Sequence, residues 1–181
     1  MTINQIPQDH LEKLLDSKRQ ADRADVTLDE LEAESTAFVR SVQQLIEHEL
    51  RICALDAMKA SDAFWQYNIA MRDEAEDQGR VGTRTRIKNN SIQCEWYINT
   101  FFNDRNAPAD AKKRVLSTYL EKGAGFRYPK SRFQKARHWE LNVIERVEDR
   151  YELVRMRSQA LAKLRRALAE YERLVERSYN A

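Results

Sequence analysis

Basic and apolar side chains alternate between residues 80 and 88. The even positions hold Arg80, Arg84, Arg86 and Lys88, and the odd positions hold Val81, Thr83, Thr85 and Ile87. Because successive side chains of a strand point to opposite faces, this spacing predicts a strand with one basic face and one apolar face. A row of guanidinium and ammonium groups is suited to bind the phosphates of a nucleic acid.

A turn at Asn89-Asn90 is expected to fold this strand onto the residues that follow it, because two asparagines suit the positive φ angles of a two-residue hairpin turn. The predicted pairs on the apolar face are Val81 with Ile98, Thr83 with Trp96, Thr85 with Cys94 and Ile87 with Ile92. Tyr97 falls on the basic face. Arg84 then lies opposite Glu95, and this pair is equally well explained as a cross-strand ion pair without a ligand.

Charge is segregated along the chain. Residues 1–79 carry 8 Lys and Arg against 17 Asp and Glu, a net charge of −9. Residues 80–137 carry 14 against 4, a net of +10, and residues 138–181 carry 9 against 8, a net of +1. A segment this basic in an otherwise acidic or neutral chain predicts a polyanionic partner. Any single cation among them is also explained as a solvated surface residue.

The side chains expected to contact nucleic acid come from the hairpin, the segment after it and the start of the last long helix. They are Arg80, Arg84, Arg86, Lys88, Tyr97, Lys112, Lys113, Arg114, Arg127, Lys130, Arg132, Lys135 and Arg137. The last four are predicted to open a helix, where backbone N–H groups and the helix dipole also favour a phosphate. Tyr128, beside that start, is a further residue that could stack on a base.

The sequence offers little for enzymatic chemistry. The three histidines are scattered, at His10, His48 and His138. No cysteine cluster accompanies them, so a zinc site is not expected. The acidic run 73–77 would need ligands from other elements to form a nuclease metal site, and a solvated helix end explains it as well. Cys53 and Cys94 lie on apolar faces and are expected to pack. We therefore expect a protein that is not an enzyme and uses no metal or cofactor.

Glycine and proline separate two long segments that contain neither residue, 28–77 and 131–178. A capping box precedes each segment, formed by Thr27 with Glu30 and by Ser131 with Gln134. Both segments carry apolar side chains at spacings of three and four residues, which predicts two long helices. Two shorter helices are expected at 9–23 and 109–122, although 115–120 also reads as a third strand.

Two helices of similar length flanking a small insert predict a mostly α protein, a long antiparallel helical hairpin that resembles a coiled coil. The insert is a basic α+β unit containing the β-hairpin. The expected parts of this one structural domain are residues 1–79, 80–130 and 131–181. One apolar stripe per helix does not distinguish pairing within a chain from pairing in a homodimer, so both remain open.

Composition predicts a cytoplasmic protein with no membrane contact. No apolar run approaches the roughly 20 residues of a membrane span. The first residues lack the apolar core of a signal peptide. The two cysteines are far apart and form no CxxC motif, which is typical of a reducing compartment.

Four short motifs carry a family resemblance: Ser91 to Tyr97 (SIQCEWY), Tyr119 to Gly123 (YLEKG), Phe126 to Pro129 (FRYP), and His138 to Glu140 (HWE) before an arginine-rich helix. In this order they resemble the MobI family of conjugative-transfer proteins, over about half of the chain. The resemblance implies an accessory factor of DNA mobilisation that acts at or near the origin of transfer alongside a relaxase and is not itself the nicking enzyme. It maps no established functional residue onto this sequence.

Two functions therefore compete. The first is a DNA-binding accessory protein of conjugative transfer. The second is a coiled-coil adaptor that binds no nucleic acid, whose basic insert docks an acidic protein or the acidic N-terminal third of its own chain. A metal-dependent nuclease built on the acidic run is a third and weaker hypothesis.

Overall fold

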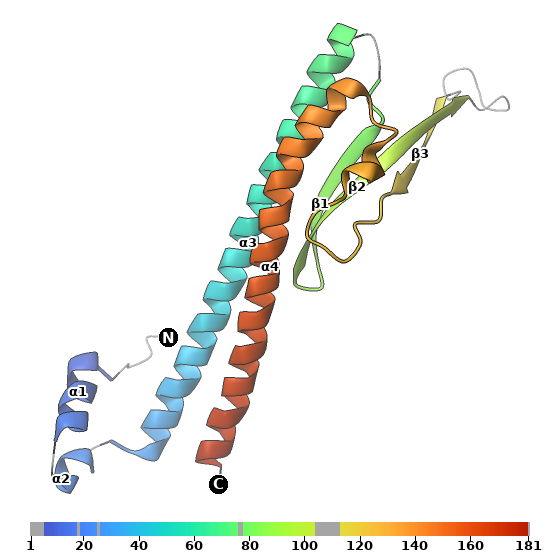
Figure 1. Ribbon diagram of the computed structural model, residues 1–181. Coiled ribbons are helices and arrows are strands. Elements are labelled where there is room, and N and C mark those ends of the chain that lie inside the picture. The colour runs from blue at the N-terminus through green and yellow to red at the C-terminus, as the bar shows by residue number, and fades with distance from the viewer. Residues whose placement is uncertain (1–5, 18, 25, 76–77, 104–112, 181) are drawn as a thin grey trace. The chain divides into compact units, whose positions relative to one another are not determined.

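The protein is mostly helical and contains one antiparallel sheet (Figure 1). The computed structural model describes residues 6–17, 19–24, 26–75, 78–103 and 113–180. Its elements are α1 (Gln8–Asp16), α2 (Gln20–Arg23), α3 (Leu28–Ala75), β1 (Val81–Lys88), β2 (Ser91–Asn103), β3 (Lys113–Tyr119), a 3₁₀ turn (Lys130–Phe133) and α4 (His138–Tyr179). No helix in this described part of the chain is long and apolar enough to span a membrane.

The contacts divide the chain into two units, Met1–His48 with Lys163–Ala181, and Glu49–Ala162. We call them unit 1 and unit 2. The sheet and all the residues predicted to bind nucleic acid belong to unit 2. The segment boundaries predicted from the sequence, at 79/80 and 130/131, stay predictions.

The hairpin forms in the register that the alternation predicts. β1 pairs with β2 from Val81↔Ile98 to Lys88↔Ser91. Asn89 and Asn90 have φ angles of 50° and 55°, as a tight turn matched to the twist of the strands requires. The pairing confirms the predicted hairpin and its two faces.

The apolar face of the hairpin packs into the core of unit 2. Trp96 is fully buried, and its ring meets Phe64 of α3 at 5.3 Å, Phe133 at 5.5 Å and Tyr151 of α4 at 5.6 Å, measured between centroids. The indole N–H donates to Glu148 Oε2 at 2.5 Å. The prediction that Trp96 faces inward is confirmed. Burial of four aromatic rings against one another gives this sheet its attachment to the helices.

A third strand replaces the helix expected at 109–122. β3 pairs antiparallel with β2, from Tyr97↔Tyr119 to Asn103↔Lys113, in the sheet order β1-β2-β3. The helical prediction is wrong where the chain is described, and the alternative reading of 115–120 as a strand is close to the observed range. Residues 109–112 lie outside the described residues. The edge of β2 opposite β1 offers backbone groups that a strand satisfies and a helix does not.

The predicted starts of the two long helices have different outcomes. Thr27 Oγ1 accepts from the Glu30 N–H at 3.2 Å, and Glu30 Oε2 accepts from the Thr27 N–H at 2.8 Å. This confirms the first capping box, and the bond from Thr27 lowers the pKa of Glu30. The second prediction is wrong, because Lys130–Phe133 forms a 3₁₀ turn and α4 begins at His138. Burial of Phe133 against Trp96 turns the chain before the helix can begin.

The single helix predicted at 9–23 is two helices, α1 and α2. Ser17 follows α1, and its hydroxyl donates to Asp22 Oδ2 at 2.6 Å and accepts from the Arg19 N–H at 3.1 Å. A serine that bonds nearby backbone and side-chain groups in this way competes with helix continuation.

Within each unit, α3 contacts α4 of the same chain. In unit 2, Asp56 of α3 pairs with Arg150 at 2.7 Å and with Arg157 at 3.0 Å. In unit 1, the rings of Phe38 and Tyr171 meet edge to face at 5.8 Å. A coiled-coil hairpin over the whole length and a homodimer stay predictions.

Candidate nucleic-acid interface

The outward face of the hairpin holds Arg84 and Arg86, as the alternation predicts, but the two share a carboxylate. Glu95 Oε2 lies 3.4 Å from Arg84 Nη2, and Glu95 Oε1 lies 3.1 Å from Arg86 Nη2. Arg84 also lies over the ring of Tyr119, 5.4 Å from its centroid. The cross-strand ion pair therefore forms, and only part of the positive charge of this face is left for a ligand. Lys88, at the end of β1, is exposed.

Tyr97 lies on the same face and is already in contact with its neighbours. Its ring meets that of Tyr119 at 5.5 Å. A Cβ added at Gly82 would come within 2.2 Å of the Tyr97 ring, so the ring lies directly across this glycine. Burial raises the pKa of the Tyr97 hydroxyl. This ring is consequently less available to stack on a base than the sequence suggests.

Three of the cations between β3 and α4 are paired with carboxylates. Arg127 bonds Asp149 and lies 3.2 Å from Glu152, and the bond to Asp149 raises the pKa of Arg127. Two further pairs are Lys130 with Glu145 at 2.7 Å and Arg132 with Glu121 at 3.7 Å. These pairs are largely exposed, so they contribute little to stability. They do reduce the positive charge along this side of unit 2.

Tyr128 is not placed to stack on a base. Tyr128 is buried, and the guanidinium of Arg155 lies over its ring, 5.1 Å from the centroid. The Tyr128 N–H donates to Glu148 Oε1 at 2.8 Å, which fixes the backbone here against α4. The expectation from the sequence is wrong because Tyr128 is part of the core.

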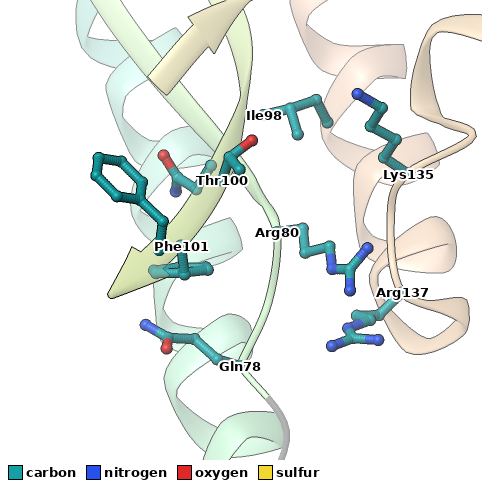
Figure 2. A pocket seen from close by; sticks show the side chains of 9 residues that line it. Gln78, Arg80, Ile98, Thr100, Phe101, Lys135 and Arg137 are labelled. Carbon is teal, nitrogen blue, oxygen red and sulfur yellow. The ribbon is translucent and has the colours of Figure 1, made fainter. Parts of the chain in front are cut away.

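Three of the predicted residues meet at one pocket of about 420 Å³ (Figure 2). β1 begins at Val81, opposite Ile98, whereas β2 continues to Asn103 with β3 on its other side. Beyond Asn99, the edge of β2 that faces β1 has no strand of the described residues beside it. We call this edge of residues 100–103 the open edge of β2. The pocket lies along this edge and is lined by Gln78, Arg80, Ile98, Asn99, Thr100, Phe101, Phe102, Lys135 and Arg137.

Three cationic side chains line the pocket. Figure 2 shows the side chains of Arg80 and Arg137 reaching toward one another from facing segments, with Lys135 on the same side as Arg137. Among the described residues that line the pocket, none is an Asp or Glu. Cations that lie close together repel one another, so a bound anion stabilises their arrangement.

One buried carboxylate holds the two segments that carry these cations. Glu140 Oε1 accepts from the Val81 N–H at 2.9 Å, and Glu140 Oε2 accepts from the Arg137 N–H at 2.7 Å. Gly79 is required beside it, because a Cβ there would lie 2.6 Å from Glu140 Oε1 and 2.5 Å from Asn68 Nδ2. The start of β1 and the start of α4 are thereby fixed relative to each other.

A family model described as MobI protein matches residues 54–169. The chain belongs to the MobI family. The resemblance noted in the sequence is confirmed, and membership makes this a mobilisation-related protein. The match contains the whole sheet and every residue predicted to bind nucleic acid. Neither the curated proteins nor the solved structures contain a match to the chain.

A second pocket of about 250 Å³ adjoins the first in this MobI chain. The two share Ile98, Thr100 and Lys135. The second adds Thr118, Leu120, Ser131, Arg132 and Gln134. Its described lining also lacks Asp and Glu, so the carboxylate-free surface continues past Lys135.

The remaining predicted residues lie elsewhere. Arg114 is an exposed residue of β3. Lys113 belongs to the same strand, but its side chain lies outside the described residues, as does the whole of Lys112. The described side chains among the thirteen therefore do not form one patch. Arg80, Lys135 and Arg137 line one pocket, Arg132 lines the adjoining pocket, and Arg84 and Arg86 lie on the outward face.

Sequence reasoning missed the buried ion pair of this MobI chain. Arg155 Nη1 lies 2.7 Å from Glu148 Oε1, and its Nη2 donates to the Cys94 carbonyl at 2.9 Å. The only signal was a pair of opposite charges seven residues apart, next to the apolar stripe of the helix.

Metal chemistry finds no support in the described part of the chain, where no group of three or more His, Cys, Asp or Glu side chains is placed to hold an ion. The side chains of the acidic run 73–77 lie outside the described residues. The nuclease hypothesis, which depends on residues 73–77, therefore stays a hypothesis.

Proposed function

We propose that this MobI-family chain is a DNA-binding accessory protein of conjugative transfer that acts at or near the origin of transfer together with a relaxase. One observation carries the proposal. Arg80 and Lys135, from segments 55 residues apart, line one pocket with Arg137 and without a carboxylate among the described lining residues. Family membership supplies the context, because a mobilisation protein works where DNA is the polyanion at hand.

Phosphate is the ligand that suits this pocket best. Arg presents a planar set of N–H donors that matches two phosphate oxygens, and Lys adds a point charge beside it. Arg86, Arg127 and Lys130 are weaker candidates. They already pair with Glu95, Asp149 and Glu145, respectively. We expect these to add to the general attraction for DNA rather than to hold it.

Fluorescence anisotropy with a labelled duplex from the cognate origin of transfer tests the proposal. Arg80→Ala/Lys135→Ala is expected to weaken binding at least tenfold and to reduce the slope of log K against log salt by about 2, for two lost phosphate contacts. Arg127→Ala/Lys130→Ala removes the same charge from ion-paired positions and serves as the matched control, with an expected loss below threefold.

A third variant separates the pocket from the hairpin. Arg84→Ala/Arg86→Ala is expected to behave like the control. If this variant loses the most affinity, the outward face is the interface and the pocket is not. If wild-type protein binds no DNA even at low salt, the proposal is wrong altogether.

The relaxase part of the proposal needs its own assay. Nicking of a supercoiled plasmid that carries the origin of transfer is measured with the cognate relaxase, with and without this protein. We expect added protein to raise the nicked fraction. An unchanged nicked fraction at saturating protein contradicts a role at the nicking step.

A protein-interaction adaptor that binds no nucleic acid remains the second candidate, and exposed apolar side chains favour it. In unit 2 these include Ile52 and Leu55 of α3, and Leu153 and Met156 of α4, each more than 40% exposed. Such side chains on helices are typical of surfaces that bind other helices. Tight binding to the relaxase without any DNA affinity would select this function.

A further inference from the structure

We infer that the pocket at the open edge of β2 binds single-stranded DNA, with a base stacked on Phe101 or Phe102 and its phosphates held by Arg80 and Lys135. This inference rests on the proposed function and specifies the form of DNA that the chain takes. Four features of the site carry it.

The first feature is a pair of phenyl rings that the core does not use. Phe101 is 37% exposed and Phe102 is 47% exposed, whereas Trp96, on the same strand, is fully buried. Both rings line the pocket. Stacking of bases on aromatic side chains is the main way in which proteins hold single strands, and it works with any base because each has a flat face.

The second feature is a backbone donor at the open edge. The Asn99 N–H bonds the Arg80 carbonyl at 2.7 Å, so it points to the side of β1. Alternate residues of a strand direct their N–H and C=O groups to the same side, and the Phe101 N–H therefore points to the side that β1 leaves open. A phosphate or the edge of a base can accept from it.

The third feature is the form of the surface. The cations lie in a recess of about 420 Å³ rather than on a ridge. In a duplex the bases are stacked inside and paired, so only the phosphates reach a protein surface of this kind. An unpaired strand can turn a base into the recess while its phosphates stay at the rim.

The fourth feature is continuity. The adjoining pocket of about 250 Å³ shares Lys135 with the first and adds Ser131 and Arg132, which lies 3.7 Å from Glu121. A strand that places one base beside Phe101 or Phe102 can therefore continue past Lys135 over a surface without carboxylates among its described residues. This suits a ligand that extends in one dimension better than a small anion.

The experiment uses the full chain and two probes, fluorescein-labelled oligo-dT of twelve nucleotides and the same strand annealed to oligo-dA. We expect the single strand to bind at least tenfold more tightly than the duplex. Phe101→Leu/Phe102→Leu keeps the apolar volume and removes both rings, and it is expected to weaken binding of the single strand at least fivefold. Leu153→Ala/Met156→Ala changes exposed apolar residues of α4 that do not line the pocket, and it is the matched control, with an expected change below twofold.

Two further measurements distinguish loss of base stacking from loss of folding, and a DNA ligand from an acidic protein. A thermal melt shows whether the Leu variant keeps the stability of wild type, so that lost binding is not lost folding. Poly-glutamate, which has the charge but no rings to stack, is expected to displace oligo-dT at least a hundredfold less well than unlabelled oligo-dT. Displacement by poly-glutamate at equal concentration overturns the inference in favour of an acidic protein ligand.

Equal or tighter binding of the duplex, with no effect of removing both rings, also overturns the inference and leaves the proposed DNA-binding function standing. Absence of binding to either probe and to the origin duplex removes both proposals.

Discussion

The buried carboxylate of Glu140 accepts a hydrogen bond from the backbone N–H of Val81 at 2.9 Å. Its other oxygen accepts from the Arg137 N–H, so one side chain of the first turn of α4 joins the start of β1 to the segment before α4. Arg80 directly precedes Val81. The separation of Arg80 and Arg137 across the pocket is therefore set by a residue that does not line it.

This relationship predicts the effect of Glu140→Gln. An amide offers one oxygen in place of two, so one of the two backbone N–H groups loses its partner inside the core. An unsatisfied buried donor costs about 1–3 kcal/mol of unfolding free energy. Urea denaturation should show a loss of that size. DNA affinity at a temperature where the variant is folded should also fall, because the cations are no longer held at a fixed separation.

A suitable control is Glu145→Gln. Glu145 is on the same helix as Glu140, and its exposed carboxylate pairs with Lys130 of the 3₁₀ turn. This substitution should leave the unfolding free energy within about 0.5 kcal/mol. If Glu140→Gln and Glu145→Gln behave alike, Glu140 does not have the positioning role given to it here.

The second prediction concerns the buried pair of Glu148 and Arg155. Arg155→Met keeps most of the side-chain volume but leaves the Glu148 carboxylate without its cation, although the Trp96 and Tyr128 N–H bonds remain. Breaking a buried ion pair from one side costs about 3–5 kcal/mol. We expect a loss in this range by urea denaturation. Arg127→Met breaks an exposed pair with Asp149, a residue of the same helix as Glu148, and should cost less than about 1 kcal/mol.

The hairpin shows how far the sequence alone can specify structure. Its register follows from a period of two and from the turn at Asn89-Asn90, both of which are local properties. The third strand could not be predicted from local sequence properties in the same way. The side chains at 111, 115 and 119 also fit a helix, and pairing with the edge of β2 opposite β1 favours the strand. No local pattern in residues 113–119 indicates that this segment pairs with β2.

The pocket was still harder to foresee. Arg80 and Lys135 were both predicted to bind nucleic acid, but so were eleven other residues, and nothing in their spacing distinguishes these two. A long-range hydrogen bond from the Val81 N–H to Glu140, together with a local one from the Arg137 N–H, brings their segments together. The neutralisation of Arg127 by Asp149 was equally hidden, because that ion pair joins a loop residue to a residue of α4 that lies 22 positions away.

The third prediction tests the contact between Gly82 and Tyr97. A Cβ at position 82 would lie 2.2 Å from the Tyr97 ring, so Gly82→Ala must displace the ring or the strand. We expect a loss of about 1–3 kcal/mol in unfolding free energy, as for other overpacked sites. The contact itself is measured by a double-mutant cycle. In a Tyr97→Ala background, Gly82→Ala should cost less than about 0.5 kcal/mol, and an equal cost in both backgrounds would show that the ring is not the cause.

The fourth prediction concerns pH. Burial raises the pKa of the Cys94 thiol to about 12, whereas an exposed thiol ionises near roughly 8.5. Between these values the unfolded chain releases a proton that the folded chain keeps, so the free energy of unfolding decreases as pH rises. The decrease is at most about 1.4 kcal/mol per pH unit for one such group. Burial also raises the pKa of Tyr151 and Tyr128, so part of the decrease above pH 10 comes from them.

Cys94→Ala isolates the thiol. Urea denaturation of wild type and variant between pH 8 and 10 should give a smaller decrease with pH in the variant, whatever its stability at pH 8. The Cys53 thiol is buried as well, and its pKa is also raised, so neither cysteine should react with a thiol-exchange reagent at pH 8 until the chain is unfolded. Rapid reaction of Cys94 in the folded protein, or identical pH dependence of the two proteins, would contradict the burial of this side chain between the sheet and α4.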